Sequence, residues 1–167
     1  MKSVDKYLFQ ALDNYPYWLE GTIESLDYAL SYDDKNTTAL CLYGRIHAEQ
    51  LQDYEGAKNY FQQAISIDIH ALEVYPHYIE TLLLNEDFEE ARKLIDFALT
   101  IKGVKKVEIK LKLVSLLERQ LAFKKALKLL KKVKLELIVS DHNYQIEETE
   151  KRLNSKLETN SKKKKKK

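Results

Sequence analysis

Histidine, cysteine and paired carboxylates are the residues of this chain that could do chemistry, and their spacing does not assemble a site. The four histidines, His47, His70, His77 and His142, are scattered over different predicted helices and turns. The sequence holds no G-x-G-x-x-G, P-loop, G-x-S-x-G or H-E-x-x-H motif, and its four glycines are too few for a phosphate-cradling loop. We therefore expect no catalytic residue, no metal and no cofactor, and the chain is predicted not to be an enzyme.

The single cysteine, Cys41, excludes an internal disulfide and any cysteine-based zinc site. We interpret it as a small buried or groove residue rather than a nucleophile. The carboxylate pairs Glu89-Glu90 and Glu147-Glu148 fall on predicted solvent faces and need no functional explanation.

Composition favours a helical protein. Of the 167 residues, 44% are hydrophobic and 32% are charged, while only four are glycine and two are proline, too few for the many turns of a barrel or sandwich. The first ten residues lack the apolar centre of a signal peptide, and no apolar run approaches the roughly 20 residues of a membrane span. We therefore expect a cytoplasmic, soluble chain with no membrane span.

One phrase returns three times and predicts the architecture. It reads DYEGAKNYFQQAISIDI from Asp53, DFEEARKLIDFALTI from Asp87 and AFKKALKLLKKVK from Ala122. When the three phrases are aligned, an aromatic residue is followed by a small residue, a bulky apolar residue and a second small or branched residue. The aligned sets are Tyr54/Phe88/Phe123, Ala57/Ala91/Ala126, Phe61/Ile95/Leu130 and Ala64/Ala98/Val133. The aligned alanines are 34 and 35 residues apart, a period typical of stacked helical hairpins. Thr22, Leu26 and Ala29 continue the register into a more divergent first copy.

The repeated phrase resembles the second helix of a tetratricopeptide (TPR) repeat, and Leu40, Tyr43, Gly44 and His47 resemble the W-x-x-L-G-x-x-Y phrase of a TPR first helix. The resemblance implies an all-α, right-handed α-solenoid of about four TPR-like hairpins, with a C-terminal capping helix. The implied solenoid covers residues 1–140, with hairpins at about 2–34, 37–69, 71–102 and 105–139, followed by the capping helix at 141–158 and a disordered poly-lysine tail at 159–167.

Several local features follow from this register. Gly44 is expected to admit close approach of the partner helix, since a helical glycine otherwise costs about 1 kcal/mol relative to alanine. The spacing from Gly44 to Ala57 is one residue longer than the family's, which predicts an insertion around 51–53. Asn36 or Thr37 is expected to cap the following helix. Pro16 is expected in the first turn of the helix at about 17–31. Pro76 is expected either to kink its helix or to move the start of that helix to about residue 75.

The resemblance also implies a partner-binding groove lined by the first helices of the hairpins. The residues in the family's inward-facing register are Thr38, Cys41, Arg45 and Ala48, then Glu73, His77, Glu80 and Leu83, then Glu108, Leu111, Lys112, Ser115 and Glu118. The lysines and asparagines with which chaperone-tail binders grip a terminal carboxylate are missing from these positions. We therefore expect a non-catalytic interaction scaffold or adaptor that binds a basic and apolar peptide or partner segment, with a merely solvated groove as the alternative.

Tyrosine is abundant, and most of the eleven tyrosines fall at repeat packing positions. Tyr7 and Tyr17 are freer candidates for recognition, whereas Trp18 is expected to pack the first hairpin.

Charge is strongly polarised along the chain. Residues 1–100 hold 7 Lys+Arg and 18 Asp+Glu, a formal charge of −11, whereas residues 101–167 hold 21 and 8, a charge of +13. This charge asymmetry would permit head-to-tail self-association of chains. The alternative is that the charged residues only form solvent-exposed faces and have no binding role. As an alternative function, the Lys-rich C-terminal half would bind nucleic acid or an anionic surface. Arg119 is the one arginine in 102–134, and no aromatic residues interleave with the lysines, so this function remains the second choice.

Overall fold

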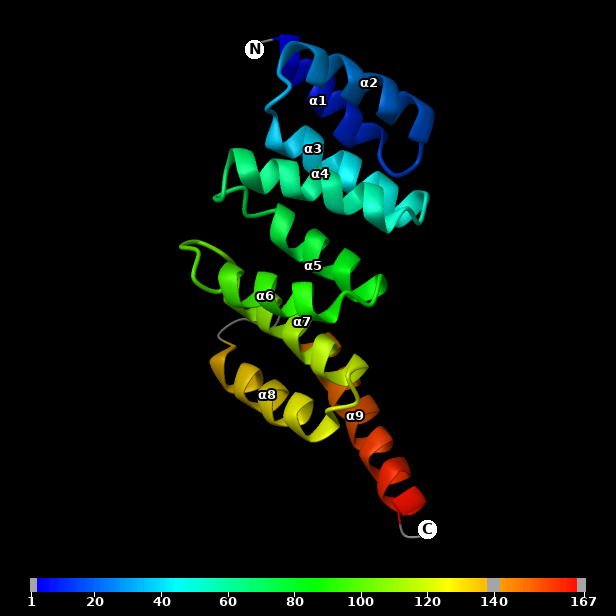
Figure 1. Cartoon of the computed structure of the whole chain (residues 1–167), viewed down its shortest axis with the longest axis vertical. Coiled ribbons are helices and arrows are strands. Elements are labelled where there is room, and N and C mark those ends of the chain that lie inside the picture. The colour runs from blue at the N-terminus through cyan, green and yellow to red at the C-terminus, as the bar shows by residue number, and fades with distance from the viewer. Residues whose placement is uncertain (1–2, 138–141, 165–167) are drawn as a thin grey trace. The chain divides into compact units, whose positions relative to one another are not determined.

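The structure, a computed structural model, describes residues 3–137 and 142–164. Every secondary-structure element in this part of the chain is helical, which confirms the all-α class. In chain order the elements are α1 (Ser3–Asn14), α2 (Leu19–Tyr32), α3 (Thr37–Arg45), the π-helix η1 (Ile46–Gln50), α4 (Tyr54–Ile67), α5 (Val74–Leu84), α6 (Phe88–Ala98), α7 (Lys106–Arg119), α8 (Phe123–Glu136) and α9 (Asn143–Lys164) (Figure 1).

The chain divides into two compact units. Unit 1 comprises residues 1–87 and 101–103 and contains α1 to α5, whereas unit 2 comprises residues 88–100 and 104–167 and contains α6 to α9. The two helices of the predicted third hairpin, α5 and α6, therefore belong to different units. Each unit is described by itself below.

The aligned positions of the repeated phrase form the cores of both units. All twelve are at most 1% exposed, namely Thr22, Leu26 and Ala29 in α2, Ala57, Phe61 and Ala64 in α4, Ala91, Ile95 and Ala98 in α6, and Ala126, Leu130 and Val133 in α8. Small residues let the facing helix approach, and the bulky residue fills the space between them. The sequence register therefore predicted these core positions correctly.

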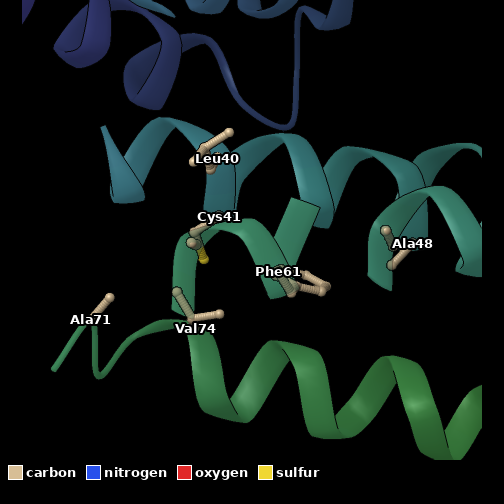
Figure 2. Close-up of a cluster of buried hydrophobic side chains, with 8 residues drawn as sticks. Leu40, Cys41, Ala48, Phe61, Ala71 and Val74 are labelled. Atoms are coloured by element: carbon tan, nitrogen blue, oxygen red, sulfur yellow. The ribbon is translucent and has the colours of Figure 1, made fainter. Parts of the chain in front are cut away.

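In unit 1 consecutive helices pack against each other, α1 with α2 and α3 with α4, and α5 packs against both α4 and α3. Figure 2 shows a buried cluster that includes Cys41 of α3, Phe61 of α4 and Val74 of α5, together with residues of η1 and of the turn before α5. A Cβ atom built at Gly44 would lie 2.5 Å from Cε1 of the Phe61 ring. The expected close approach at Gly44 is thus confirmed.

Three of the turns between helices contain a residue with a positive φ angle at the same position of the repeated phrase. Gln52, Glu86 and Leu121 all have positive φ angles, between 54° and 61°, and each lies two residues before the aligned aromatic. After Glu86 and Leu121, the next backbone N–H donates to a carbonyl five residues back, at 2.9 and 2.8 Å. This pairing is the one that closes helices through a left-handed residue, and it repeats at the same register.

The first of these turns differs because of η1. There the N–H of Asp53 reaches back six residues, to the carbonyl of His47 at 2.9 Å, and the N–H of Leu51 donates to the carbonyl of Ile46 at 3.2 Å. The extra residue that the spacing indicated is therefore accommodated by the π-turn at 46–50. Its predicted location at 51–53 was wrong.

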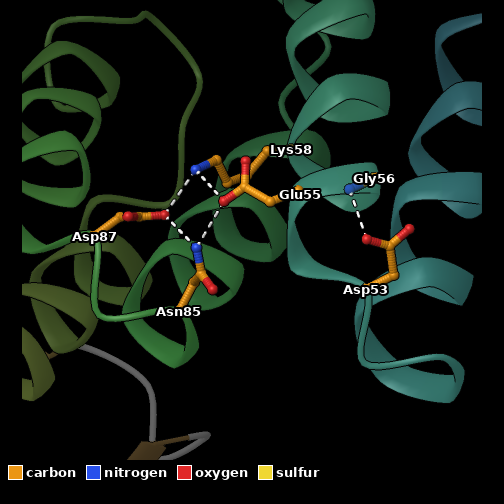
Figure 3. A network of polar contacts seen from close by, with 6 residues as sticks. All are labelled: Asp53, Glu55, Gly56, Lys58, Asn85 and Asp87. Atoms are coloured by element: carbon orange, nitrogen blue, oxygen red, sulfur yellow. Dashed lines mark hydrogen bonds and ion pairs between the residues drawn. The ribbon is translucent and has the colours of Figure 1, made fainter.

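A polar network joins the turn after α5 to the first turn of α4 (Figure 3). Lys58 Nζ lies 2.9 Å from Glu55 Oε1 and 2.8 Å from Asp87 Oδ2, and Asn85 Nδ2 donates to the same two oxygens at 3.0 and 2.7 Å. Hydrogen bonds from Lys58 and then Asn85 lower the pKa of Asp87. The network holds α5 and α4 of unit 1 together at one end.

Asn36 and the two prolines lie near helix starts in unit 1. Asn36 caps α3, because its side chain accepts a hydrogen bond from the N–H of Ala39 at 2.9 Å, and α5 begins at Val74, close to the start that Pro76 predicted. Pro16 lies in the turn between α1 and α2 instead of the first turn of a helix, because α2 begins only at Leu19.

In unit 2, α6 packs against α7, α7 against α8, and α9 against α8. The apolar side chains of α9, Ile146 and Leu153, are buried with those of α7 and α8, so α9 covers their apolar faces as a capping helix does. Its length differs from the expectation. The helix α9 includes residues 159–164, whereas residues 165–167 of the predicted tail lie outside the described residues.

Candidate partner-binding surface

The first helices of the second and third hairpins meet along the register that was predicted to line a groove. Thr38 Oγ1 donates to Glu73 Oε1 at 3.2 Å, and Cys41 Sγ lies 4.0 Å from the Glu73 carbonyl oxygen. Thr38 is partly exposed and Glu73 is exposed, whereas Cys41 is only 4% exposed. Cys41 therefore supports this surface from below and presents little of itself to a partner.

A carboxylate that sequence reasoning missed lies at the centre of the surface. Glu49 accepts hydrogen bonds from the Tyr15 hydroxyl and from Arg45 Nε, the second at 3.2 Å, and His77 Nδ1 lies 3.8 Å from the same Glu49 oxygen as Arg45. The Arg45 guanidinium also lies over the Tyr15 ring, 4.8 Å from its centroid. Glu49 thus links the turn after α1 with α3 and α5 of unit 1, while its side chain remains 41% exposed.

Burial alone would raise the pKa of Glu49, but the hydrogen bonds from Tyr15 and Arg45 outweigh burial and lower it. Burial, followed by the bond to Glu49, raises the pKa of Tyr15 to about 12. Glu49 is therefore a carboxylate at neutral pH, and Tyr15 is a neutral hydrogen-bond donor to it.

The π-turn explains why Glu49 faces this side. The family register placed Ala48 on the wall of the groove, but one extra residue per turn rotates the following positions. Ala48 is 7% exposed and belongs to the core, and Glu49 takes the exposed position next to it. The signal in the sequence was the long spacing from Gly44 to Ala57, which fixes the number of extra residues without fixing where they lie.

We call this region the α3–α5 surface and define it by Thr38, Arg45, Glu49, Glu73, His77 and Glu80. Glu73, His77 and Glu80 share one face of α5 because they are spaced by four and three residues. The six residues include three carboxylates and one arginine, so their formal charge is −2 when His77 is counted as neutral. The surface is acidic, and its acids come from adjacent helices.

The predicted polar groove residues of unit 2 are only partly exposed, and one of them is buried. Glu108, Lys112 and Ser115 are partly exposed along one face of α7, but Glu118 is buried and held by α9. Arg152 donates to its two carboxylate oxygens at 2.8 and 2.9 Å, and Lys156 Nζ donates to Oε1 at 2.6 Å. The expectation that Glu118 faces a partner is therefore wrong, because α9 already supplies its cations.

Catalytic chemistry gains no support from the geometry. His47 Nδ1 pairs with Asp53 Oδ2 at 2.8 Å, and the His47 ring packs against Tyr60 with centroids 5.0 Å apart. His47 therefore has the packing position expected for it. No group of three or more His, Cys, Asp or Glu in the described part of the chain could hold a metal ion.

We expect the Cys41 thiol to be nearly inert in the folded chain. Burial, followed by the nearby Glu73 carboxylate, raises the pKa of Cys41 to about 12, so the reactive thiolate is scarce at neutral pH. Labelling with a disulfide reagent at pH 8 should be at least about a hundredfold slower for the native chain than for the chain in denaturant. Equal rates in the two conditions would contradict the buried position of Cys41.

Comparison with known proteins gives no further identity. No protein-family model matches the chain, and no curated protein is similar to it. Within the described residues, none of the helices combines the length and apolar character needed to cross a membrane.

Proposed function

We propose that the chain is a non-catalytic protein-interaction module, a TPR-like α-solenoid that acts as a scaffold or adaptor in the cytoplasm. Two observations support the repeat architecture. The twelve register positions are buried alike in four helices, and the left-handed turn residue recurs at one register in three turns between helices. Hairpins built on one plan commonly stack into surfaces that bind extended partners.

We infer that the α3–α5 surface binds a peptide or partner segment with basic and apolar residues. The observation that carries this proposal is that Glu49 and Glu73, from neighbouring segments of unit 1, are both exposed carboxylates. Arg45 is already engaged by Glu49 and the Tyr15 ring, so the surface offers negative potential to a ligand. Lysine or arginine side chains of a partner would complement this potential.

Selection from a displayed library of random peptides tests the proposal. Peptides retained by the full chain should be enriched in Lys or Arg beside bulky apolar residues. The charge-reversed variant Glu73→Lys/Glu80→Lys should bind them at least about tenfold more weakly, because it replaces attraction with repulsion. Isothermal titration of one selected peptide provides the measurement.

The matched control is Asp13→Lys/Asp34→Lys, which makes the same change in net charge at two exposed positions of unit 1 outside the surface. It should leave the affinity within about twofold of the original chain, because distant exposed charges are screened by salt. Selected peptides that are acidic, or that bind the Glu73→Lys/Glu80→Lys variant as well as the original, would refute the proposal.

Binding of nucleic acid or an anionic surface by the Lys-rich half stays the second candidate. One observation favours it: five lysines of α8 are exposed and have no acidic partner among the described residues. These lysines are Lys124, Lys125, Lys128, Lys131 and Lys132.

A further inference from the structure

The outer faces of α2 and α8 carry opposite charges at equivalent repeat positions. In α2 the exposed positions are Glu20, Glu24 and Asp27, and in α8 the positions at the same register are Lys124, Lys128 and Lys131. Each set has the spacing i, i+4, i+7, so each forms a stripe along one side of its helix. The same register in α4 and α6 holds neutral or mixed residues, namely Glu55, Asn59 and Gln62, and Glu89, Lys93 and Asp96.

No acidic partner is seen for the lysine stripe of α8 among the described residues, although several other cations of unit 2 are paired. Lys134 lies 3.1 Å from Glu150, and Arg152 and Lys156 are bound to Glu118. No acidic side chain of the described residues approaches the stripe. Its like charges are one helical turn apart and repel one another, which favours an acidic surface brought from outside.

An apolar pocket adjoins the N-terminal end of the lysine stripe. It has a volume of about 370 Å³, and Leu121, Phe123 and Leu157 line it together with Lys124 and Lys125. Leu121 is 70% exposed. An occupant that carries an apolar group beside negative charges would pair with the lysines and fill this pocket together.

The α2 stripe supplies that combination. Tyr17 and Trp18 come just before Glu20 and are 92% and 55% exposed. Exposed aromatic rings thus lie at the N-terminal end of the acidic stripe, and the pocket lies at the N-terminal end of the lysine stripe. Trp18 lies against Gly21 in the first turn of α2 but is 55% exposed, so its packing of the first hairpin stays a prediction. Glu20 and Glu24 are exposed and have no cationic partner in the described part of the chain.

We propose that the α8 stripe and its pocket bind α2 of a second copy of this chain. With the two helices running in the same direction, the acids of one copy meet the lysines of the other while Tyr17 or Trp18 enters the pocket. Unit 1 has 6 Lys+Arg and 15 Asp+Glu, a formal charge of −9, and unit 2 has 22 and 11, a formal charge of +11. The long-range attraction between unit 1 of one copy and unit 2 of another therefore favours the same contact. The two surfaces differ, so the contact is head-to-tail and the assembly grows with concentration.

Light scattering and sedimentation of the full chain test this proposal. The average mass should rise with chain concentration in about 0.1 M NaCl, and association should weaken at least about tenfold in about 1 M NaCl, where the Debye length falls from about 10 to about 3 Å. The variants Glu20→Lys/Glu24→Lys and Lys124→Gln/Lys128→Gln/Lys131→Gln should each remain a single chain.

A mixture of these two variants gives the sharpest result. One intact acidic stripe and one intact lysine stripe remain between them, so the mixture should form species of two chains and nothing larger. The control Lys93→Gln/Lys105→Gln/Lys106→Gln removes the same charge from exposed positions outside the stripe and should assemble as the original chain does.

Three results would overturn the proposal. The first is a measured mass of one chain at every protein concentration and every salt concentration. This result would overturn the proposal even if the single chain binds duplex DNA or anionic vesicles. The second is equal loss of association in the control and in the stripe variant. The third is a mixture of the two stripe variants that remains single chains, although circular dichroism shows both to be folded.

Discussion

Replacing Gly44 with alanine will destabilise the chain by about 2 kcal/mol, although alanine is the better helix former. A Cβ atom at this position would lie 2.5 to 2.8 Å from three carbons of the Phe61 ring. Phe61 is fully buried and stacks on Tyr78, with centroids 5.6 Å apart, so the ring has little room to move away. The steric cost therefore exceeds the gain of about 1 kcal/mol in helix propensity.

Urea unfolding followed by fluorescence measures this effect, because the one tryptophan, Trp18, is in unit 1 with both residues. A double-mutant cycle with Phe61→Leu isolates the clash, since the smaller side chain leaves space for the new methyl group. Gly44→Ala should cost at least about 1 kcal/mol less in the Phe61→Leu background than in the original one. A stabilised Gly44→Ala chain, or strict additivity in the cycle, would show that α3 and α4 are not so closely packed.

Neutralising Glu118 will release α9 from α7 and α8. The Glu118→Gln variant leaves Arg152 and Lys156 without their shared carboxylate, and we expect a loss of about 2 kcal/mol, reduced from the value for a fully buried pair because both cations are about half exposed. Hydrogen exchange of the α9 amides measures this loss where it occurs. Glu108→Gln is the matched control, since Glu108 is on the same helix and is partly exposed.

The same interaction predicts how stability depends on pH. Hydrogen bonds from Arg152, opposed in part by burial, and further hydrogen bonds from Lys156 lower the pKa of Glu118 to about 2 from an ordinary value of 4.5. A carboxyl whose native pKa is lowered contributes stability that is complete above pH 4.5 and is lost as the pH falls toward 2. Protection of α9 should therefore decline over that interval in the original chain and change less in Glu118→Gln. A parallel decline in both proteins would contradict the assignment.

Core positions were predictable from the sequence because burial imposes a periodic demand on residue type. Ala57 and Phe61 recur as Ala91 and Ile95 because each hairpin must present a small residue and a bulky one at the same place. Gly44 carried similar information, since a glycine inside a helix needs a steric reason. These inferences required only spacing and side-chain volume.

The candidate surface was less predictable because it depends on helix phase and on distant partners. The spacing before Ala57 revealed one extra residue, but the π-turn that accommodates it, and that turns Glu49 outward, has no residue signature here. The pairing of Glu118 with Arg152 joins positions 34 residues apart and follows no helical period. The lysines after Asn160 predicted disorder by composition, yet lysine is also a good helix former, and α9 continues to Lys164.

The π-turn at 46–50 has a consequence for how proteins of this kind can diversify. Inserting one residue into a straight helix would shift every later side chain and disturb the core, but here the insertion is absorbed within a single turn. Leu42 before it and Phe61 after it stay buried, while Glu49 takes the exposed position next to the buried Ala48. A one-residue change in length can thus change which side chain is exposed while the core is preserved.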